Sequence, residues 1–276
     1  MSTFNSFVNV INSYQRGIPG LIGRQNAKPL GKGHEKRFIV TTVGKVLDTI
    51  QPLPSSSILL GRCMDGLPFF MTLSDPEIGA VLIGGDRGCG KTHHLQVMVD
   101  SAVRMNAPRD LQVVVLTHKT NEWEAYQIDS HYGKYLRALH AWYDGNAART
   151  IKSLMKMAES RRESGQGGPA ILLILDDLNF IEELNYEAQF NIHWLLAYGA
   201  QVNIWVLGAI NTGFAKAFRY WMELFRTRIV GCVRNKKKLE NLTLVPGLQM
   251  KPLDPASFRV WTGTDWLTYQ LPLLGD

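Results

Sequence analysis

Four residues, Gly85, Gly90, Lys91 and Thr92, have the types and spacing of a phosphate-binding loop. They follow an apolar run that begins at Val81, as expected of the strand before such a loop. The glycine-rich turn lets successive backbone N–H groups point at phosphate oxygens, at the positive end of the next helix. In such a loop the lysine neutralises the terminal phosphates, and the threonine hydroxyl binds magnesium. Cys89 needs to supply only its backbone N–H. The predicted nucleotide-binding residues are Gly85, Asp86, Arg87, Gly88, Cys89, Gly90, Lys91, Thr92 and His93.

Two adjacent acids, Asp176 and Asp177, follow a second apolar run that starts at Ala170. One carboxylate at the C-terminal tip of a buried strand can hold the magnesium shell, and the next can orient the attacking water. Asn211 lies just beyond the following apolar run, where a polar side chain can reach the terminal phosphate. We therefore predict that Thr92 and Asp176 bind the metal and that Asp177 orients the water. Ordinary solvated acids at a strand end are the alternative.

Regular elements must position these residues, and the apolar pattern predicts an α/β fold. After the loop, buried strands alternate with helices, which is typical of a parallel sheet, and we expect five core strands. A hairpin is predicted before the loop and another near the C-terminus. Besides the strand that leads into the loop, strands are expected at 38–42, 58–61, 67–73, 111–116, 170–175, 202–207, 227–233, 258–261 and 266–271. Helices are expected at 92–105, 146–162, 184–198 and 214–225.

Several local features accompany these elements. The segment 117–145 has no regular pattern and is rich in aromatic residues. Arg161 and Arg162 are expected on the exposed side of the helix that ends near them. Gly199 is expected to end the helix before it.

Composition limits the partners and the compartment. The chain has 276 residues and a formal net charge of +6, which suits a polyanionic partner, either nucleic acid or an anionic membrane surface. It contains no run of eighteen apolar residues and no signal-peptide pattern, so we expect no membrane insertion. Three cysteines are too few for a disulfide framework, which favours a reducing compartment, and we predict a cytoplasmic protein.

Residues 1–57 are predicted to form a basic arm and linker, and residues 58–276 a single main domain. The first 34 residues contain no Asp or Glu, and 15–37 is glycine-rich and basic. This arm either contacts phosphates or a neighbouring subunit, or is a solvated leader. A second basic cluster follows the last core strand. It either contacts a polyanion or is a solvated surface. Its members are Arg234, Lys236, Lys237 and Lys238.

The order and spacing of these parts resemble the FtsK/HerA superfamily of hexameric DNA translocases, and most closely the FtsK-like motor domain. The resemblance covers roughly 58–233. The stretches that carry it are GRCMDGLPFFMTLSDP, VLIGGDRGCGKTHHL, LQVVVLTHK, MAESRRES, ILLILDDLNF, VNIWVLGAIN and RTRIVGCV.

The resemblance implies a RecA-like, mostly parallel sheet and an ATPase that uses Mg²⁺. Its partners would be DNA, most often double-stranded, and further copies of the chain in a hexameric ring. Arg228 lies where RTRI resembles the family's arginine in that strand. The catalytic residues that the resemblance implies are Lys91, Asp176, Asp177, Asn211 and Arg228.

The chain departs from the family pattern at several positions. Asp177 stands where glutamate is usual, and Asn211 stands where FtsK-like motors read T-Q-R-P. The segment 197–201 has no basic residue where these motors carry an arginine that reaches the neighbouring subunit's nucleotide. If such an arginine exists here, its candidates are Arg161, Arg162, Arg226 and Arg228.

Two functions from different classes follow. The first is a ring-forming ATPase that binds and translocates DNA, with further protein partners allowed. The second is an ATP-switched assembly or scaffold protein that acts on a protein partner. A small-molecule kinase is disfavoured, because the sequence has no obvious arginine-bearing lid.

Overall fold

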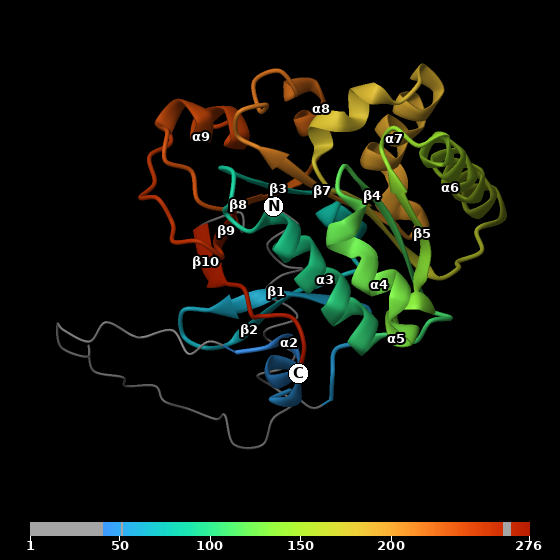
Figure 1. The fold of residues 1–276 in the computed structure, drawn as a ribbon, viewed down its shortest axis with the longest axis horizontal. Coiled ribbons are helices and arrows are strands. Elements are labelled where there is room, and N and C mark those ends of the chain that lie inside the picture. The colour runs from blue at the N-terminus through green and yellow to red at the C-terminus, as the bar shows by residue number, and fades with distance from the viewer. Residues whose placement is uncertain (1–40, 51, 262–265) are drawn as a thin grey trace.

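The computed structural model describes residues 41–50, 52–261 and 266–276 of the chain, and one ten-stranded mixed sheet runs through them (Figure 1). The predicted basic arm and most of the expected strand 38–42 lie outside the described residues, as does the tip of the C-terminal hairpin. The sheet order is β2-β1-β10-β9-β8-β3-β7-β6-β4-β5. The strands are β1 Ser57–Cys63, β2 Pro68–Thr72, β3 Val81–Gly85, β4 Leu111–Thr117, β5 Leu136–Ala141, β6 Ala170–Leu175, β7 Ile204–Asn211, β8 Thr227–Val230, β9 Ser257–Trp261 and β10 Trp266–Gln270.

Six neighbouring strands, from β8 to β5 in the sheet order, are parallel. Five of them confirm the predicted core, and β5 adds a sixth within the segment expected to be irregular. In parallel strands all C-terminal ends meet at one edge of the sheet. The ends of β3, β6 and β7 therefore lie together, and we call this edge the site edge.

The other strands extend the sheet in antiparallel pairing. Both predicted hairpins are confirmed, as β1 with β2 and as β9 with β10. They also pair with each other, since Arg62 in β1 lies opposite Gln270 in β10. β9 in turn pairs with β8, so the two hairpins and the parallel strands form a continuous sheet.

Helices cover both faces of the sheet (Figure 1). The buried side of α3 packs on one face together with aromatic residues from α4 and the turn after α5. α6, α7, α8 and α9 contribute to the core on the other face. α2 packs against β1 and α3. The helices are α2 Val43–Asp48, α3 Lys91–Met105, α4 Glu124–Ile128, α5 Ser130–Gly133, α6 Gly145–Ser164, α7 Tyr186–Tyr198, α8 Arg219–Glu223 and α9 Lys236–Thr243, with 3-10 turns η1 Pro76–Ile78, η2 Thr120–Trp123, η3 Leu178–Glu183 and η4 Gly199–Val202.

One predicted helix end is confirmed and one predicted helix is too long. α7 ends at Tyr198 with Gly199 as its C-cap, and the chain continues through η4 to Asn203, which has φ 59°. A Cβ at Gly199 would lie 2.6 Å from the Ile204 carbonyl oxygen, so the close approach of β7 requires this glycine. The expected helix 214–225 is shorter, since 212–218 forms turns and only α8 is helical.

Two strand ends also differ from the prediction. β7 extends to Asn211, which is its last residue rather than a position beyond its tip. β8 ends at Val230 rather than at 233. Across the described parts of the chain, no helix has the length and hydrophobicity needed to span a membrane.

Candidate nucleotide-binding and hydrolysis site

The phosphate loop connects β3 to α3 at the site edge. Gly88 and Gly90 have φ 81° and 95°, in the left-handed region that favours glycine. Asp86 fixes the loop to its neighbours, because its N–H donates to the Cys232 carbonyl at 2.8 Å. Its carboxylate accepts from the Thr212 hydroxyl and, at 3.0 Å, from the Arg234 N–H. Burial opposes ionisation of Asp86, but these hydrogen bonds and the nearby cations lower its pKa overall.

Lys91 is buried at the start of α3, and its ammonium group lies inside the loop. Nζ donates to Asn211 Oδ1 at 2.7 Å and to the Asp86 carbonyl at 3.1 Å. The Gly85 carbonyl lies 3.4 Å from the same nitrogen. The structure therefore brings the loop lysine and the polar tip of β7 together.

Asp176 occupies the centre of the site at the end of β6. Its carboxylate accepts from the Thr92 hydroxyl at 3.1 and 3.2 Å, from Trp123 Nε1 at 3.2 Å and from the Thr117 hydroxyl at 3.4 Å. Burial raises the pKa of Asp176 to about 6, although the hydrogen bonds from Trp123 and Thr92 favour its ionised form. The charge of Asp177 raises this pKa further.

Asp177 is the last member of this polar group. Its backbone is left-handed, with φ 61°. Its Oδ1 accepts from Asn211 Nδ2 at 3.2 Å. The Asn211 amide thus accepts from Lys91 and donates to Asp177. This arrangement links the phosphate loop, the β7 tip and the second acid through one side chain.

The residues at this position fit a nucleotide with magnesium. The Thr92 hydroxyl and the Asp176 carboxylate are hard oxygen donors in mutual contact, and magnesium prefers such ligands. Lys91 is held by carbonyl and amide oxygens, which phosphate oxygens can replace. Backbone N–H groups at the start of α3 provide the rest of an anion site.

Sequence reasoning missed two tryptophans that hydrogen-bond to Asp176. Trp123 donates to the Asp176 carboxylate, and Trp142 Nε1 donates to the Asp176 carbonyl at 3.0 Å. Both are fully buried and come from the segment 117–145. No spacing in that segment indicates this role. A role for Thr117 could have been predicted, because it is the polar last residue of a mostly apolar strand.

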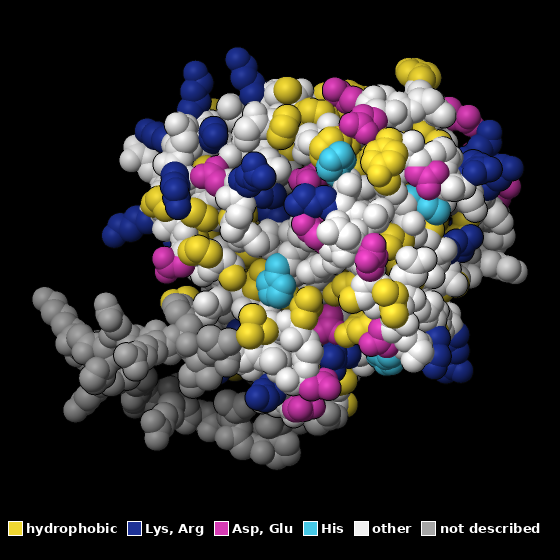
Figure 2. All heavy atoms as spheres, viewed as in Figure 1, with side chains coloured by type: hydrophobic (Ala, Val, Ile, Leu, Met, Phe, Trp, Pro, Cys, Tyr) yellow, Lys and Arg dark blue, Asp and Glu magenta, His cyan; other side chains and the backbone are white. Residues whose placement is uncertain are grey.

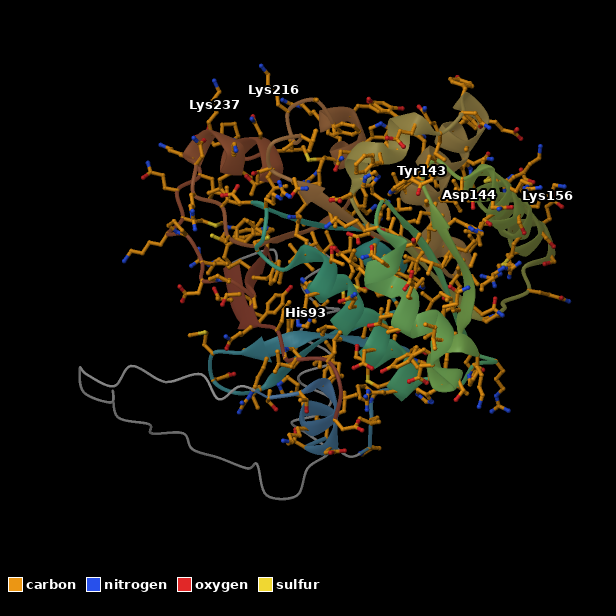
Figure 3. All side chains as sticks on the ribbon, viewed as in Figure 1. His93, Tyr143, Asp144, Lys156, Lys216 and Lys237 are labelled. Atoms are coloured by element: carbon orange, nitrogen blue, oxygen red, sulfur yellow. The ribbon has the colours of Figure 1, made fainter. Side chains whose placement is uncertain are left out.

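Some predicted nucleotide-binding residues contribute little to the cluster through their side chains. The Cys89 thiol is buried next to Gly85 and Gly231, and burial raises its pKa. His93 points toward the C-terminal segment, where Nε2 lies 3.0 Å from the Pro272 carbonyl (Figure 3). Arg87 is exposed on the loop.

Arg228 is not brought to the cluster. It is the second residue of β8 and pairs with Leu82, toward the sheet edge opposite the phosphate loop. Its guanidinium donates to the Met222 carbonyl at 2.9 Å and lines a cavity of about 340 Å³ with Trp261 and Trp266. Within the described residues, no arginine hydrogen-bonds to Asp176, Asp177 or Asn211.

Two further candidates, Arg161 and Arg162, lie near the end of α6. Arg161 was expected to be exposed, and this expectation is wrong, because it donates to the carbonyls of Val202 and Pro169 at 2.9 and 2.8 Å and is half-buried. Arg162 is exposed, as expected.

The comparisons with known proteins agree with this geometry. The model of the FtsK/SpoIIIE family matches residues 51–164, which include the phosphate loop and α3. No curated protein sequence matches the chain.

Solved structures share the fold at low identity. ATPases 2 and 3 of Thermomonospora curvata EccC, in complex with a signal sequence peptide, have a TM-score of 0.65 at 15% identity, covering 86% of this chain and 44% of that one. EssC ATPases 2 and 3 from Geobacillus thermodenitrificans have a TM-score of 0.63 at 15% identity, with coverage of 81% and 48%. The pCW3 conjugation coupling protein TcpA has a TM-score of 0.62 at 14% identity, with coverage of 82% and 68%.

The chain thus spans less than half the length of the EccC and EssC chains it matches. The shared architecture is the RecA-like sheet with helices on both faces. The family match covers the phosphate loop, and the structure adds the acids and the polar strand tip that complete the site. Residues 51–164 thus match the FtsK/SpoIIIE family, and the described chain has the fold of the EccC, EssC and TcpA structures.

Proposed function

We propose that this protein is an ATP-hydrolysing motor that assembles as a homohexameric ring in the cytoplasm, binds double-stranded DNA and moves along it. The observation that carries the proposal is the contact series from Lys91 through Asn211 to Asp177, beside the contact of Thr92 with Asp176. It unites a phosphate-binding cation, a metal-binding pair and a carboxylate for water in one polar group.

In the proposed reaction each side chain has a separate task. Lys91 exchanges its carbonyl contacts for phosphate oxygens and stabilises the charge on the leaving group. Asp177 accepts a hydrogen bond from the attacking water and aligns it with the terminal phosphate. Asn211 holds the Asp177 carboxylate in place and contacts the phosphate that Lys91 binds. Magnesium, when held by Thr92 and Asp176, neutralises charge on the phosphate oxygens.

Exposed cations near the phosphate loop support a DNA partner. Arg234 and three lysines at the start of α9 are exposed, and the Arg234 N–H contacts Asp86 of the loop. Lys216, in the connection after β7, is also exposed. Lys216 and Lys237 project outward from the same upper edge of the molecule (Figure 3), where further Lys and Arg side chains gather (Figure 2). Such a surface suits the phosphates of a DNA backbone, and the basic arm within 1–57 would add to it.

ATP turnover with and without duplex DNA tests the proposal. We expect phosphate release to rise when duplex DNA is added and to vanish in Lys91→Ala. Lys156→Ala, on the exposed side of α6, is the matched control and should retain turnover. If the rate of ATP turnover does not change with duplex DNA of any length, at low or high salt, the translocase part of the proposal is contradicted.

A protein partner is the second candidate, because EccC, which shares the fold, is solved in complex with a signal sequence peptide. In that case the chain would be an ATP-switched assembly protein. Nucleotide would then govern oligomerisation with negligible steady-state turnover. A motor would instead show continuous turnover, so sedimentation and phosphate release on one preparation separate the two.

A further inference from the structure

Two of the three cysteines of the chain lie beside each other at the phosphate loop. Cys89 is part of the loop after β3, and Cys232 follows β8, which is the neighbour of β3 in the sheet (Figure 1). Both are free thiols. The Asp86 N–H donates to the Cys232 carbonyl at 2.8 Å, so a hydrogen bond attaches the loop to the segment that carries the second cysteine.

The Cys89 sulfur occupies a narrow space between these two segments. A Cβ at Gly231 would lie 3.1 Å from Cys89 Sγ. A Cβ at Gly85 would lie 2.5 Å from the same sulfur and 3.4 Å from the Cys232 carbonyl oxygen, so one added carbon would touch both cysteines. Both side chains also pack in the same part of the core. The two glycines thus keep open the space through which the thiols face each other.

The two thiols differ in their access to solvent. Cys89 is 3% exposed, whereas Cys232 is partly exposed. A small oxidant dissolved in water therefore meets Cys232 first. Cys89 can react only afterwards and from inside the protein, which is the position of a resolving thiol.

Cys89 also contacts the lysine of the loop. Lys91 Nζ lies 4.0 Å from Cys89 Sγ. Burial raises the pKa of the Cys89 thiol, and the Lys91 ammonium partly opposes this effect by favouring the thiolate. A sulfur that moves toward Cys232 therefore leaves the lysine and takes with it the Cys89 N–H, which the phosphate-binding loop requires.

The glycines on both sides of Cys89 allow this movement. Gly88 and Gly90 have left-handed backbones, and a Cβ at Gly88 would meet no described atom within 4 Å. Glycine passes between backbone regions at little steric cost. The loop can therefore carry Cys89 toward Cys232 while the hydrogen bonds of β3 stay in place.

We propose that Cys89 and Cys232 form a reversible disulfide in the presence of hydrogen peroxide and that this bond inactivates the phosphate loop. This inference rests on the proposed function, because it regulates the same site. The bond holds Cys89 away from Lys91, so the loop N–H groups and the ammonium no longer face one phosphate group together. In a reducing compartment cellular thiols reverse the bond, which distinguishes it from a structural disulfide.

The oxidation has two balanced steps. The Cys232 thiolate attacks one peroxide oxygen, the O–O bond breaks, and the departing hydroxide leaves as water after taking a proton. The sulfur is now a sulfenic acid. The Cys89 thiolate then attacks the Cys232 sulfur, the S–S bond forms, the S–O bond breaks, and a second water leaves. Two thiols and one peroxide thus give one disulfide and two waters, with two electrons passing from sulfur to oxygen.

Peptide mass spectrometry tests whether this bond forms. Trypsin places the three cysteines in separate peptides, namely 63–87, 88–91 and 229–234. Reduced protein is exposed to hydrogen peroxide, blocked with N-ethylmaleimide and digested without reductant. We expect a linked pair of 88–91 with 229–234, lighter by two hydrogens than the two peptides together, which dithiothreitol separates. Absence of this pair, or a bond from either peptide to 63–87 in its place, would overturn the inference.

ATP turnover in the same samples tests the effect of the bond. A displacement of about 1 Å in a catalytic site can cost about a hundredfold in rate, so we expect a loss of this size that dithiothreitol reverses. Cys232→Ser should keep the turnover of the reduced wild type and resist peroxide. Cys63→Ala, which removes the cysteine in β1, is the matched control and should still respond to peroxide like the wild type. Equal inactivation of Cys232→Ser, or a linked protein with full turnover, would overturn the inference.

A bound nucleotide separates the loop movement from a mere contact of two thiols. With AMP-PNP and Mg²⁺ added before peroxide, the linked peptides should form more slowly, because phosphates hold the loop in place. Equal rates with and without the analogue would overturn the inference. Absence of turnover in the reduced wild type would contradict the proposed function instead, and formation of the linked peptides and their separation by dithiothreitol would still decide whether the disulfide exists.

Discussion

The fold buries the Asp176 carboxylate, and burial disfavours its ionised form. It is 3% exposed, and burial raises its pKa from 3.8 to about 6. Between these values the folded protein binds a proton that the unfolded chain has released, so stability falls as the pH rises through this window. At pH 7.5 without magnesium the ionised group costs about 3 kcal/mol.

The first prediction follows from this cost. Asp176→Asn keeps an acceptor for Thr92 but carries no charge, so it should be more stable than the wild type at pH 7.5 without magnesium. The difference should shrink as the pH falls from about 6 to about 4. Urea unfolding at several pH values measures it, with Asp48→Asn on the surface as the control. A variant less stable than the wild type at every pH would contradict the burial argument.

Cys89 gives a second prediction at the residue scale. Cys89 is 3% exposed, and because burial raises the pKa of its thiol, little reactive thiolate is present. Iodoacetamide should therefore modify the partly exposed Cys232 well before Cys89 in the folded protein. Peptide mass spectrometry over time follows both sites, and unfolded protein gives the control rates. Rapid modification of Cys89 in the folded protein would mean that the loop opens.

The third prediction concerns how β3 supports α9. A Cβ at Gly84 would lie 2.1 Å from Cδ1 of Leu242, whose side chain is buried and cannot move aside. Gly84→Ala should therefore displace α9 and lower the free energy of unfolding by about 1–3 kcal/mol. Gly213→Ala, which meets open space, is the control. Urea denaturation compares the two, and equal stability would show that α9 shifts without cost.

The sequence predicted elements where one local signal dominated. β6 is a continuous apolar run, and β4 is apolar except for Gln112 and its last residue Thr117, which is the pattern of strands buried on both faces. β5 was missed because it is an edge strand, in which exposed Arg137 interrupts half-buried neighbours. The expected helix 214–225 had helical spacing, but tertiary packing kept only α8 helical. The pairing of Arg62 with Gln270 has no local signal at all.

The candidate site was likewise predictable only where a local sequence motif indicates it. Lys91, Thr92 and Asp176 were predicted to act together, because their motifs encode both chemistry and position, and they are in contact or linked through Asn211 and Asp177. Trp123 and Trp142 could not be predicted, since their contacts with Asp176 depend on the course of an irregular segment. The catalytic roles of these side chains stay predictions.

At the scale of the whole molecule, the clustered cations give the fourth prediction. Replacing Lys236, Lys237 and Lys238 with alanine should weaken duplex DNA binding equally for all sequences. For each phosphate that these lysines no longer neutralise, the slope of log affinity against log salt should become shallower by about 0.9. Fluorescence anisotropy at several salt concentrations measures the slope. Lys156→Ala should leave it unchanged, and an unchanged slope in the triple variant would remove α9 from the DNA surface.

The pairing of β1 with β10 determines when the sheet can be completed during synthesis. β1 and β2 leave the ribosome early, yet the strand that pairs with Arg62 comes only at Gln270. Until then the β1 edge has unpaired backbone groups and can pair with other chains. Such distant pairing also slows folding, because a long loop must close before the contact forms. The hairpin of β1 and β2 is therefore the part of the new chain that would benefit most from a chaperone.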